Sequence, residues 1–285
     1  MHLTPEELEL LPADADIAFY QEHGFYKSRK IFTDEELAVA IAGSERFYRG
    51  ERDEPLPRHP GGGWRPEHGN VLRKNDYASL QNRELTALIR KPVLAAIAAC
   101  LTGAASIRLF HDQLLYKPTS DPSKPINVGW HTDRMYWQTC SSTKMLTAWV
   151  PFHDCDEQMG TITMIDKSHQ WPDNAQNLNF FDNDLKGMEQ SFLTNGQPVV
   201  KVPVNLLKGE VSFHSCLTIH GSGPNFSTQP RRSIAVHLQD GANQHRGLSD
   251  ENWADLHDEL EGLCRVVNGI PDYSDPRICP VLWSK

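Results

Sequence analysis

The second half of the chain contains many short runs typical of β-strands, separated by turn residues rather than by helices. These runs cover residues 106–117, 146–152, 160–165, 199–204, 210–214 and 232–239. Strands that follow one another without helices pair as antiparallel sheets, whereas a parallel sheet needs helical crossovers. The pattern therefore predicts a sandwich or barrel and argues against a parallel sheet.

The first hundred residues indicate mainly helix. Thr4 precedes a proline and two glutamates, and Thr33 precedes Asp-Glu-Glu, so each threonine is placed to cap a helix. A further helix is expected over about 83–101, with Gly103 at its end. Residues 53–70 contain four prolines and three consecutive glycines. They predict a long loop, which is either a lid or binding loop or a surface excursion.

The predicted elements divide one domain of 285 residues into three parts. We expect a helical N-terminal part over about 1–104, a β core over about 105–240 and a helical tail over about 241–285, with its helix near 251–264. No internal repeat occurs at a period of about 20–50 residues, which excludes solenoids and propellers.

The charge balance argues against phosphate-rich partners. The chain has 28 Lys and Arg against 37 Asp and Glu, for a net charge of −9, so we expect neither nucleic acid nor a membrane surface as partner. No run reaches the roughly 20 apolar residues of a membrane helix, and the polar N-terminus is unlike a secretory signal. Six scattered cysteines without a C-x-x-C pair predict reduced thiols. We expect a cytoplasmic protein, and the pattern sets no oligomeric state.

A candidate metal site begins at the segment Gly-Trp-His-Thr-Asp, which ends at Asp133. Residues two apart on a strand face the same side, so His131 and Asp133 could present an imidazole and a carboxylate to one metal ion. A lone His-x-Asp triplet carries little weight, because a chain with 13 histidines contains about one by chance on composition alone. The site needs a third ligand.

Residues 210–240 supply that candidate. A strand is expected to end near His214, and a short extended piece to end at His220, before the turn Gly-Ser-Gly-Pro-Asn. Two histidines and one carboxylate on one face of an iron ion leave three positions for a chelating cosubstrate and oxygen. Four other histidines could suggest a second metal site: His111, His153, His169 and His214. A surface turn is the favoured interpretation for the ligand-rich segment 153–156.

This arrangement resembles the phytanoyl-CoA dioxygenase family. The resemblance rests on the His-Thr-Asp triplet, on His220 with the turn that follows it, and on an arginine eleven residues after that histidine. The strand-like segments 113–118 and 147–152, the early Gly24 and the Thr33 cap resemble the family as well, over about residues 15–240. The resemblance implies a double-stranded β-helix, a cupin-like jelly roll with flanking helices. It also implies a non-haem oxygenase that uses Fe(II), 2-oxoglutarate and O2.

The resemblance assigns roles residue by residue. It implies His131, Asp133 and His220 as iron ligands, and an arginine that binds the distal carboxylate of 2-oxoglutarate. Arg231 is favoured over Arg232, because strand alternation gives it the small and polar neighbours Ser233, Ala235 and His237, whereas Arg232 shares a face with Ile234, Val236 and Leu238. Further 2-oxoglutarate contacts are expected at Gln113, Trp149, Ser222 and Thr132, although Trp149 is equally explained as a core aromatic.

The substrate side is less constrained by the sequence. An aromatic wall could be formed by five residues, with ordinary packing as an equal alternative for each: Trp64, Phe110, Tyr116, Tyr136 and Trp137. Lys74 or Arg73 could add charge at the rim, although solvated bases are the simpler interpretation.

The function implied by the resemblance is hydroxylation, or another oxidation, of an unactivated C–H in a small polar metabolite, with release of succinate and CO2. Two alternatives stay open. A cupin-like metalloenzyme that uses no oxygen has no purpose for the dicarboxylate anchor Arg231, and an inactive β-helix binding module has no need to keep all the ligands.

Overall fold

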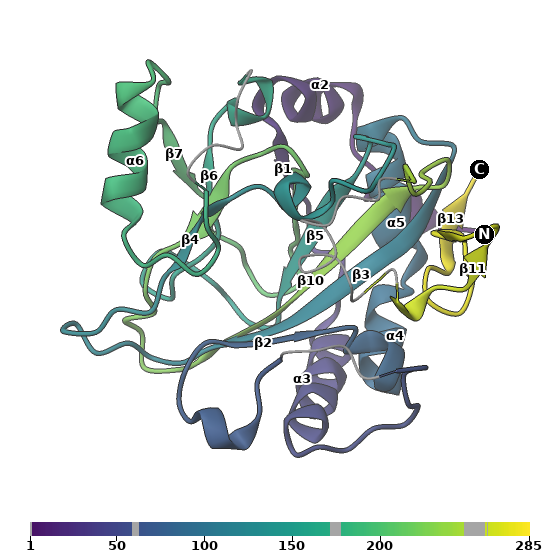
Figure 1. Cartoon of the computed structure of the whole chain (residues 1–285), viewed down its shortest axis with the longest axis horizontal. Coiled ribbons are helices and arrows are strands. Elements are labelled where there is room, and N and C mark those ends of the chain that lie inside the picture. Colours follow the sequence, from purple (N-terminus) through teal and green to yellow (C-terminus); the bar gives the residue numbers. More distant parts are fainter. Residues whose placement is uncertain (1, 59–62, 172–177, 248–259, 261) are drawn as a thin grey trace.

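The computed structural model describes residues 2–58, 63–171, 178–247, 260 and 262–285. Two antiparallel sheets pack against each other as the predicted double-stranded β-helix, with helices over the outer face of the larger sheet (Figure 1). In the view of Figure 1 both ends of the chain lie on the right-hand side of the molecule.

The larger sheet has seven strands in the order β1-β8-β5-β10-β3-β13, and β2 pairs with β3 beside this path. All its pairings are antiparallel. Its strands are β1 (Phe25–Lys27), β2 (Arg73–Asp76), β3 (Ser106–Lys117), β5 (Leu146–Pro151), β8 (Ser212–Ser215), β10 (Arg231–Asp240) and β13 (Val281–Ser284).

The smaller sheet has four antiparallel strands in the order β4-β9-β6-β7. They are β4 (Val128–His131), β6 (Thr163–Ile165), β7 (Lys201–Pro203) and β9 (His220–Ser222). A separate hairpin joins β11 (Val266–Val267) to β12 (Ile270–Pro271).

The helices lie mainly in the first hundred residues, as predicted. They are α1 (Pro5–Leu8), α2 (Asp14–His23), α3 (Asp34–Tyr48), α4 (Arg83–Ile89), α5 (Pro92–Thr102) and α6 (Leu185–Thr194). Short 3-10 turns are η1 (Pro66–His68), η2 (Ser79–Gln81), η3 (Asp133–Tyr136) and η4 (Ser168–Gln170). Both predicted caps form, and both are capping boxes, with Thr4 accepting from the backbone of Glu7 and Thr33 from that of Glu36.

Strand alternation divides the interior into two layers. On β10, the side chains of Ile234, Val236 and Leu238 join the core between the large sheet and the helices. Ala235, between them, joins the core between the two sheets, together with Trp149 of β5. The face of β10 that points between the sheets is therefore available to line a site, as alternation predicts.

Several element boundaries differ from the sequence predictions. The helix expected over 83–101 is two helices, because Pro92 disfavours the helical conformation at Lys91, whose ψ is 117°. The expected end at Gly103 is correct, with a left-handed φ of 67°. Helix α6 interrupts the β core between β6 and β7, and short edge strands β1 and β2 lie in the N-terminal part.

The tail was expected to be helical, but its described part includes β11, β12 and β13. Strand β13 pairs with β3 at the edge of the large sheet. Periodicity does not predict this pairing, because β13 has only four residues and lies far from β3 in the sequence. The helix predicted near 251–264 falls mostly outside the described residues, which leave out 248–259 and 261. The predicted loop over 53–70 includes residues 59–62, which also lie outside the described residues. Its described part contains the short 3-10 turn η1.

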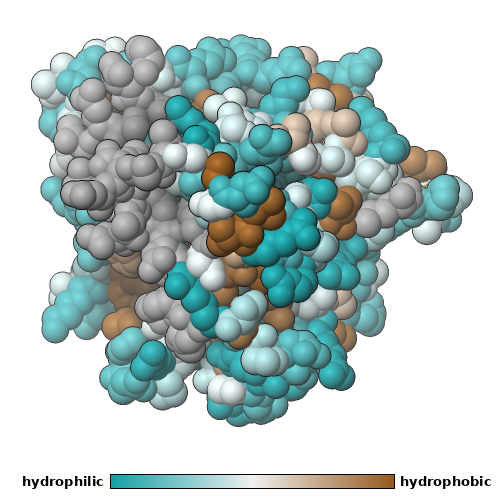
Figure 2. All heavy atoms as spheres, turned by 45° about the vertical axis from the view of Figure 1, so that its right-hand side comes forward, coloured by the Kyte–Doolittle hydropathy of each residue, from teal (hydrophilic) through white to brown (hydrophobic). Residues whose placement is uncertain are grey.

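No single helix in the described ranges is long and apolar enough to cross a membrane, although the bent pair α4 and α5 passes the same test together by length and composition. Most of α5 is buried against the large sheet. The face in Figure 2 is largely hydrophilic, and its hydrophobic side chains form small groups among polar ones.

Candidate active site

The three predicted metal ligands converge between the two sheets. One ligand atom from each of His131, Asp133 and His220 lies within 4.8 Å of the other two, and all three side chains are buried. His220 Nε2 is 3.8 Å from Asp133 Oδ1. This is the one such group of potential metal ligands among the residues that the structure describes.

His131 and Asp133 were expected on one continuous strand, but the backbone places them on two different elements. Strand β4 ends at His131, and Asp133 already begins the 3-10 turn η3. Thr132 between them keeps an extended backbone, so the two side chains still share one side. His220 was expected to end an extended piece, but it begins β9, where it pairs directly with His131.

Both histidines are oriented to offer Nε2 to a metal. Nδ1 of His131 lies 2.8 Å from the carbonyl of Gly129, and Nδ1 of His220 lies 3.0 Å from the carbonyl of Thr218. A carbonyl only accepts, so each Nδ1 carries the proton and each Nε2 keeps its lone pair. Burial lowers the pKa of His131, and burial together with the neighbouring His131 and His214 lowers that of His220 further. Both rings are therefore neutral, as metal binding requires.

The carboxylate of Asp133 is held at one oxygen. Its Oδ2 accepts a 2.5 Å hydrogen bond from the hydroxyl of Thr147 and lies 3.4 Å from Nε2 of His214. Burial acts to raise the pKa of Asp133, but His220 and the hydrogen bond with His214 outweigh it and hold this pKa well below its usual value. Oδ1 is thus the oxygen left to face the two histidines. His214 and Thr147, which carried no motif, are the support for this ligand.

An inner cavity lies behind the ligands and carries the predicted cosubstrate residues. Its lining includes Gln113, Trp149, Ser222 and Arg231, together with all three ligands. Arg231 is buried, its Nη1 donates to the carbonyl of Gly160, and its guanidinium carbon is 5.3 Å from the Trp149 ring centre. Nε of Arg231 has no partner. Arg232, on the other face, approaches Glu45 at 3.6 Å.

A second buried cation beside this cavity was missed from the sequence. Lys117 is fully buried, and its Nζ donates to Ser222 Oγ at 2.6 Å and to the carbonyl of Gly223 at 2.7 Å. It is the direct partner of Arg231 in the β3–β10 ladder. Burial, and then the charge of Arg231, lowers the pKa of Lys117 well below its usual value. The sequence did contain a signal for this lysine. Lys117 follows Gln113 by four residues and Leu115 by two, so strand alternation places its side chain on the same inward face of β3.

Like charges directly opposite each other on neighbouring strands destabilise a sheet. The lining of the inner cavity contains one carboxylate in the described part of the chain, that of the ligand Asp133. Arg231 and Lys117 therefore form a cationic end that fits a bound anion, and the unpartnered Nε of Arg231 is aimed for such a group.

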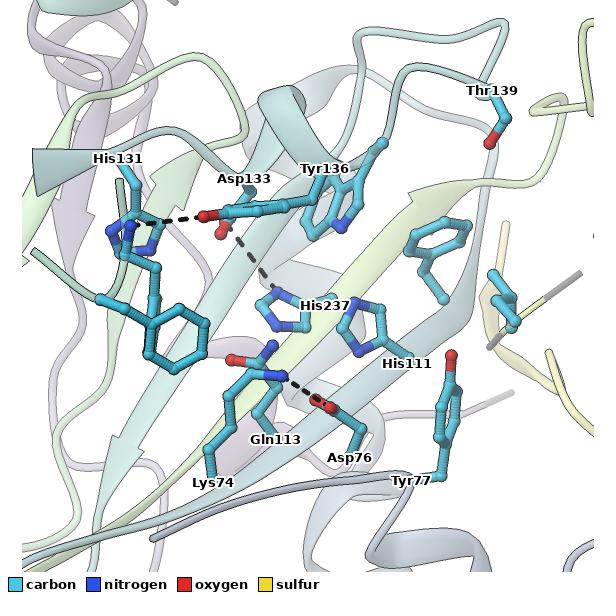
Figure 3. A pocket seen from close by; sticks show the side chains of 15 residues that line it. Lys74, Asp76, Tyr77, His111, Gln113, His131, Asp133, Tyr136, Thr139 and His237 are labelled. Carbon is cyan, nitrogen blue, oxygen red and sulfur yellow. Dashed lines mark hydrogen bonds and ion pairs between the residues drawn. The ribbon is translucent and has the colours of Figure 1, made fainter. Parts of the chain in front are cut away.

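An outer cavity of about 170 Å3 meets the inner one at His131, Asp133, Gln113 and His237 (Figure 3). Tyr136 and Trp137, two of the predicted substrate residues, line it, and so does Lys74. Aromatic rings also come from Phe110, Phe180 and Phe181.

Three other predicted residues lie elsewhere. Trp64 and Tyr116 line neither cavity and instead pack around Arg73, whose guanidinium carbon is 4.0 Å and 4.1 Å from their ring centres. Thr132 also lines neither, because its hydroxyl accepts from the backbone of Met135 and caps η3. Arg73 is thus packed between rings rather than freely solvated.

Of the four histidines that could have suggested a second metal site, two line the cavities and two lie outside them. His111 lines the outer cavity, and His214 lines the inner one. His153 accepts from the backbone of Arg232, and His169 contacts the carbonyl of Gln21, so both have local backbone partners.

Comparisons with known proteins agree with this geometry. The family model described as phytanoyl-CoA dioxygenase (PhyH) matches residues 20–233. The peroxisomal phytanoyl-CoA dioxygenase of Rattus norvegicus is 24% identical over 269 residues, covering 90% of this chain and 78% of that protein. The ectoine dioxygenase of Bordetella parapertussis is 26% identical over 246 residues, covering 79% and 74%. A solved structure of the epimerase SnoN in complex with Fe3+, alpha ketoglutarate and nogalamycin RO has a TM-score of 0.70 at 24% identity, covering 98% of this chain and all of that chain.

Proposed function

The chain belongs to the phytanoyl-CoA dioxygenase family, and on that premise we propose that His131, Asp133 and His220 hold the Fe(II) of a 2-oxoglutarate-dependent dioxygenase. The enzyme class follows from the family. The residue assignment is supported by one observation above the others: three buried ligand atoms within 4.8 Å of one another, with both imidazoles fixed as Nε2 donors.

When bound, the iron with 2-oxoglutarate and O2 supplies the oxidising chemistry that attacks an unactivated C–H and releases succinate and CO2. The protein holds the ligands on one face. Asp133 offers Oδ1 to the metal because Thr147 and His214 occupy its other oxygen. This one-sided set leaves positions open for the cosubstrate and oxygen.

We assign the inner cavity to 2-oxoglutarate. Arg231 binds the distal carboxylate through its planar guanidinium, and Ser222, held by Lys117, donates its hydroxyl to the same group. Lys117 donates to one lone pair of the Ser222 oxygen, so the hydroxyl proton remains available for the anion. Gln113 and Trp149 line the space between this end and the metal ligands.

We assign the outer cavity to the substrate, a small polar metabolite that is hydroxylated. Tyr136 and Trp137 contact it from η3 and the residue after it. Its polar lining includes Lys74, Asp76, His111 and His237.

A cupin-like metalloenzyme without oxygen chemistry, the alternative that the sequence left open, is set aside by the family assignment. The paired cations Lys117 and Arg231 favour the oxygenase, because their position beside the ligands suits a dicarboxylate cosubstrate.

The test is anaerobic titration of the full-length protein with Fe(II) and 2-oxoglutarate. We expect a weak visible charge-transfer band that needs both components. His131→Ala abolishes it, and His169→Ala, a matched change at a histidine outside both cavities, retains it. Absence of the band in the wild type, or its survival in His131→Ala, contradicts the assignment.

A further inference from the structure

The chain turns at Tyr77, directly after strand β2. The backbone of Tyr77 has a φ of 58°, in the left-handed region that bulky side chains rarely adopt. In the described ranges, Lys167 and Asn268 also have a positive φ, and neither lines one of the two cavities. Tyr77 does line the outer cavity, with its side chain almost fully buried. Backbone strain of this kind clusters at binding sites, so a functional explanation is needed.

The ring of Tyr77 lies at the end of the outer cavity that is remote from the metal ligands. In Figure 3 it stands on the opposite side of the cavity from His131, and His111 lies between them. The Tyr77 ring centre is 5.7 Å from that of His111, and the ring packs in one buried cluster with Phe110 and Trp137. A ring fixed at this place limits how far a bound molecule can extend away from the metal ligands.

A fully buried carboxylate holds the turn that carries this ring. Asp112 lies on β3 between His111 and Gln113, which line the outer cavity, so strand alternation points it to the opposite face of the sheet. There its carboxylate accepts from the backbone N–H of Ser79 at 3.1 Å and from the Ser79 hydroxyl at 2.5 Å. The carbonyl of Asp112 accepts from the backbone N–H of Tyr77 at 2.9 Å. One residue thus holds the turn at two points.

Stability alone does not explain a carboxylate at this position. Burial raises the pKa of Asp112 to about 7, although the hydrogen bonds from Ser79 act to lower it. Its partner on β10, Val236, belongs to the apolar core between the large sheet and the helices. An apolar side chain in such a core is often at least as stable as a buried charged group. The buried carboxylate and the left-handed tyrosine are therefore two costly features with one common result, a fixed ring at the end of the cavity.

We propose that Tyr77 limits the length of the substrate that the outer cavity accepts, and that Asp112 is a positioning residue that holds Tyr77 in place through the turn at Ser79. This inference rests on the proposed function, because it takes the outer cavity as the substrate site. It concerns the shape of the substrate and not its charge. Tyr77 contacts the part of the substrate that lies farthest from His131.

Four variants separate the ring from its support. Tyr77→Gly removes the ring and suits the backbone, because glycine adopts a positive φ freely, whereas Tyr77→Phe keeps the ring. Asp112→Ala removes the acceptor for Ser79. Asp112→Asn keeps an amide oxygen for the Ser79 backbone N–H and an amide N–H for its hydroxyl oxygen. Asp53→Ala is the matched control, because this carboxylate also accepts from a backbone N–H, that of Arg83, but lines neither cavity.

The probes are two series of linear molecules, primary alcohols and protonated primary amines, each from butyl to decyl. Each probe is added anaerobically to the full-length protein with Fe(II) and 2-oxoglutarate, and the shift of the charge-transfer band gives its dissociation constant. The two head groups separate the effect of chain length from that of charge. The KM for 2-oxoglutarate, from succinate release in air without a probe, reports on the inner cavity independently.

In the wild type we expect the affinity of at least one series to rise with chain length up to a limit and to fall beyond it. Tyr77→Gly should bind the first chain beyond this limit about tenfold more tightly than the wild type, which is the effect of burying roughly two more methylene groups. Asp112→Ala should extend the limit in the same direction by less. Tyr77→Phe, Asp112→Asn and Asp53→Ala should keep the wild-type limit, and the KM for 2-oxoglutarate should not change in any variant.

The inference is overturned if no probe shifts the band, if the wild type shows no length limit, or if Tyr77→Gly keeps the wild-type limit. The part assigned to Asp112 is overturned if Asp112→Ala keeps the limit, if Asp112→Asn does not restore it, or if the KM for 2-oxoglutarate changes in parallel. Should Tyr77→Gly or Asp112→Ala fail to fold, Tyr77→Asn and Ser79→Ala replace them with the same expected results. Failure of the band to form without any probe is a different result, which removes the proposed function itself.

Discussion

The inner and outer cavities share the metal ligands, but the chain builds them in different ways. The inner cavity is lined from paired strands of both sheets, including β3, β5, β8, β9 and β10. The outer cavity takes much of its wall from residues outside those strands, which are Tyr136, Trp137, Thr139, Phe180 and Phe181. Strand pairing fixes positions more strictly than connecting segments do. On the proposed assignment, the cosubstrate region is built on paired strands, and much of the substrate region is built on the segments around them.

The two cavities also differ in charge. The inner one has Arg231 in its lining, with Lys117 as the direct partner of Arg231 on β3. The outer one has a compensated pair, Lys74 and Asp76, and unpaired acceptors. Substitutions in the inner cavity should therefore change every activity that depends on 2-oxoglutarate, whereas those in the outer cavity should change the response to substrate.

The largest effect is expected where the cavities meet, at the carboxylate ligand. Asp133→Ala removes the oxygen donor and leaves Thr147 and His214 without their acceptor. Changing residues that support metal ligands typically costs about 10 to 100-fold in affinity, so loss of a ligand should lower Fe(II) affinity by more than about 100-fold. Anaerobic Fe(II) titration in the presence of 2-oxoglutarate measures it. Asp154→Ala, at an exposed carboxylate, is the control, and equal affinity in the two variants would refute the ligand assignment.

The next effect is expected at the cationic end of the inner cavity. Arg231→Met should raise the KM for 2-oxoglutarate by about 30-fold, because a charge-assisted hydrogen bond contributes about 2 kcal/mol. Arg231→Lys keeps the charge without the planar pair of donors, and its increase should be smaller. The measurement is succinate release at varied 2-oxoglutarate without substrate. Arg232→Met on the opposite face provides the comparison, and a larger effect there would reverse the choice made from strand alternation.

Lys117 acts one step behind that contact. Lys117→Met should raise the KM for 2-oxoglutarate by about fivefold, since Ser222 loses the donor that holds it. Lys124→Met, at an exposed turn lysine, should leave it unchanged. A kcat loss with an unaltered KM would instead place Lys117 outside the cosubstrate site.

The same lysine makes a pH prediction for the protein without 2-oxoglutarate. Its pKa is depressed in the folded state, so from that lowered value up to about 10.5 the unfolded chain binds more protons than the folded chain at this group. The free energy of unfolding therefore gains a contribution that increases with pH across this window. Urea unfolding of wild type and Lys117→Met at two alkaline pH values measures it, and parallel profiles for the two proteins would exclude this effect.

The sequence predicted the inner cavity far better than the outer one, for a physical reason. His131 and Asp133 lie two residues apart, and Arg231 begins an alternating strand eleven residues after His220, so alternation and the family resemblance together point to these four residues. The outer cavity brings Asp76, His237 and Phe180 together from distant parts of the chain. Which distant segments meet depends on strand register, such as Asp76 opposite Gln113, and periodicity alone does not contain it.

The fold shows the same limit. The twelve-residue β3 and the ten-residue β10 have enough alternating positions to be recognised, and their predicted ranges agree closely with the structure. Strands β1 and β13 have three and four residues and are defined by their partners β8 and β3. The sequence did not identify Lys117, because a lysine at a strand end is ordinarily exposed. Its burial follows from the pairing of β3 with β10, which places it opposite the buried Arg231.

The smallest effect is expected at the mouth of the outer cavity, where Phe181 is 73% exposed. Phe181→Ala removes little buried apolar surface, so the KM for a substrate should rise by no more than about threefold. The KM for 2-oxoglutarate, measured without substrate, should not change, because Phe181 lines only the outer of the two cavities. The neighbouring Phe180 lines both and lies 4.9 Å from the His131 ring, so Phe180→Ala should alter both constants. If Phe181→Ala changed the constant for 2-oxoglutarate as Phe180→Ala does, the two cavities would act as one compartment, and the division between cosubstrate and substrate regions would be wrong.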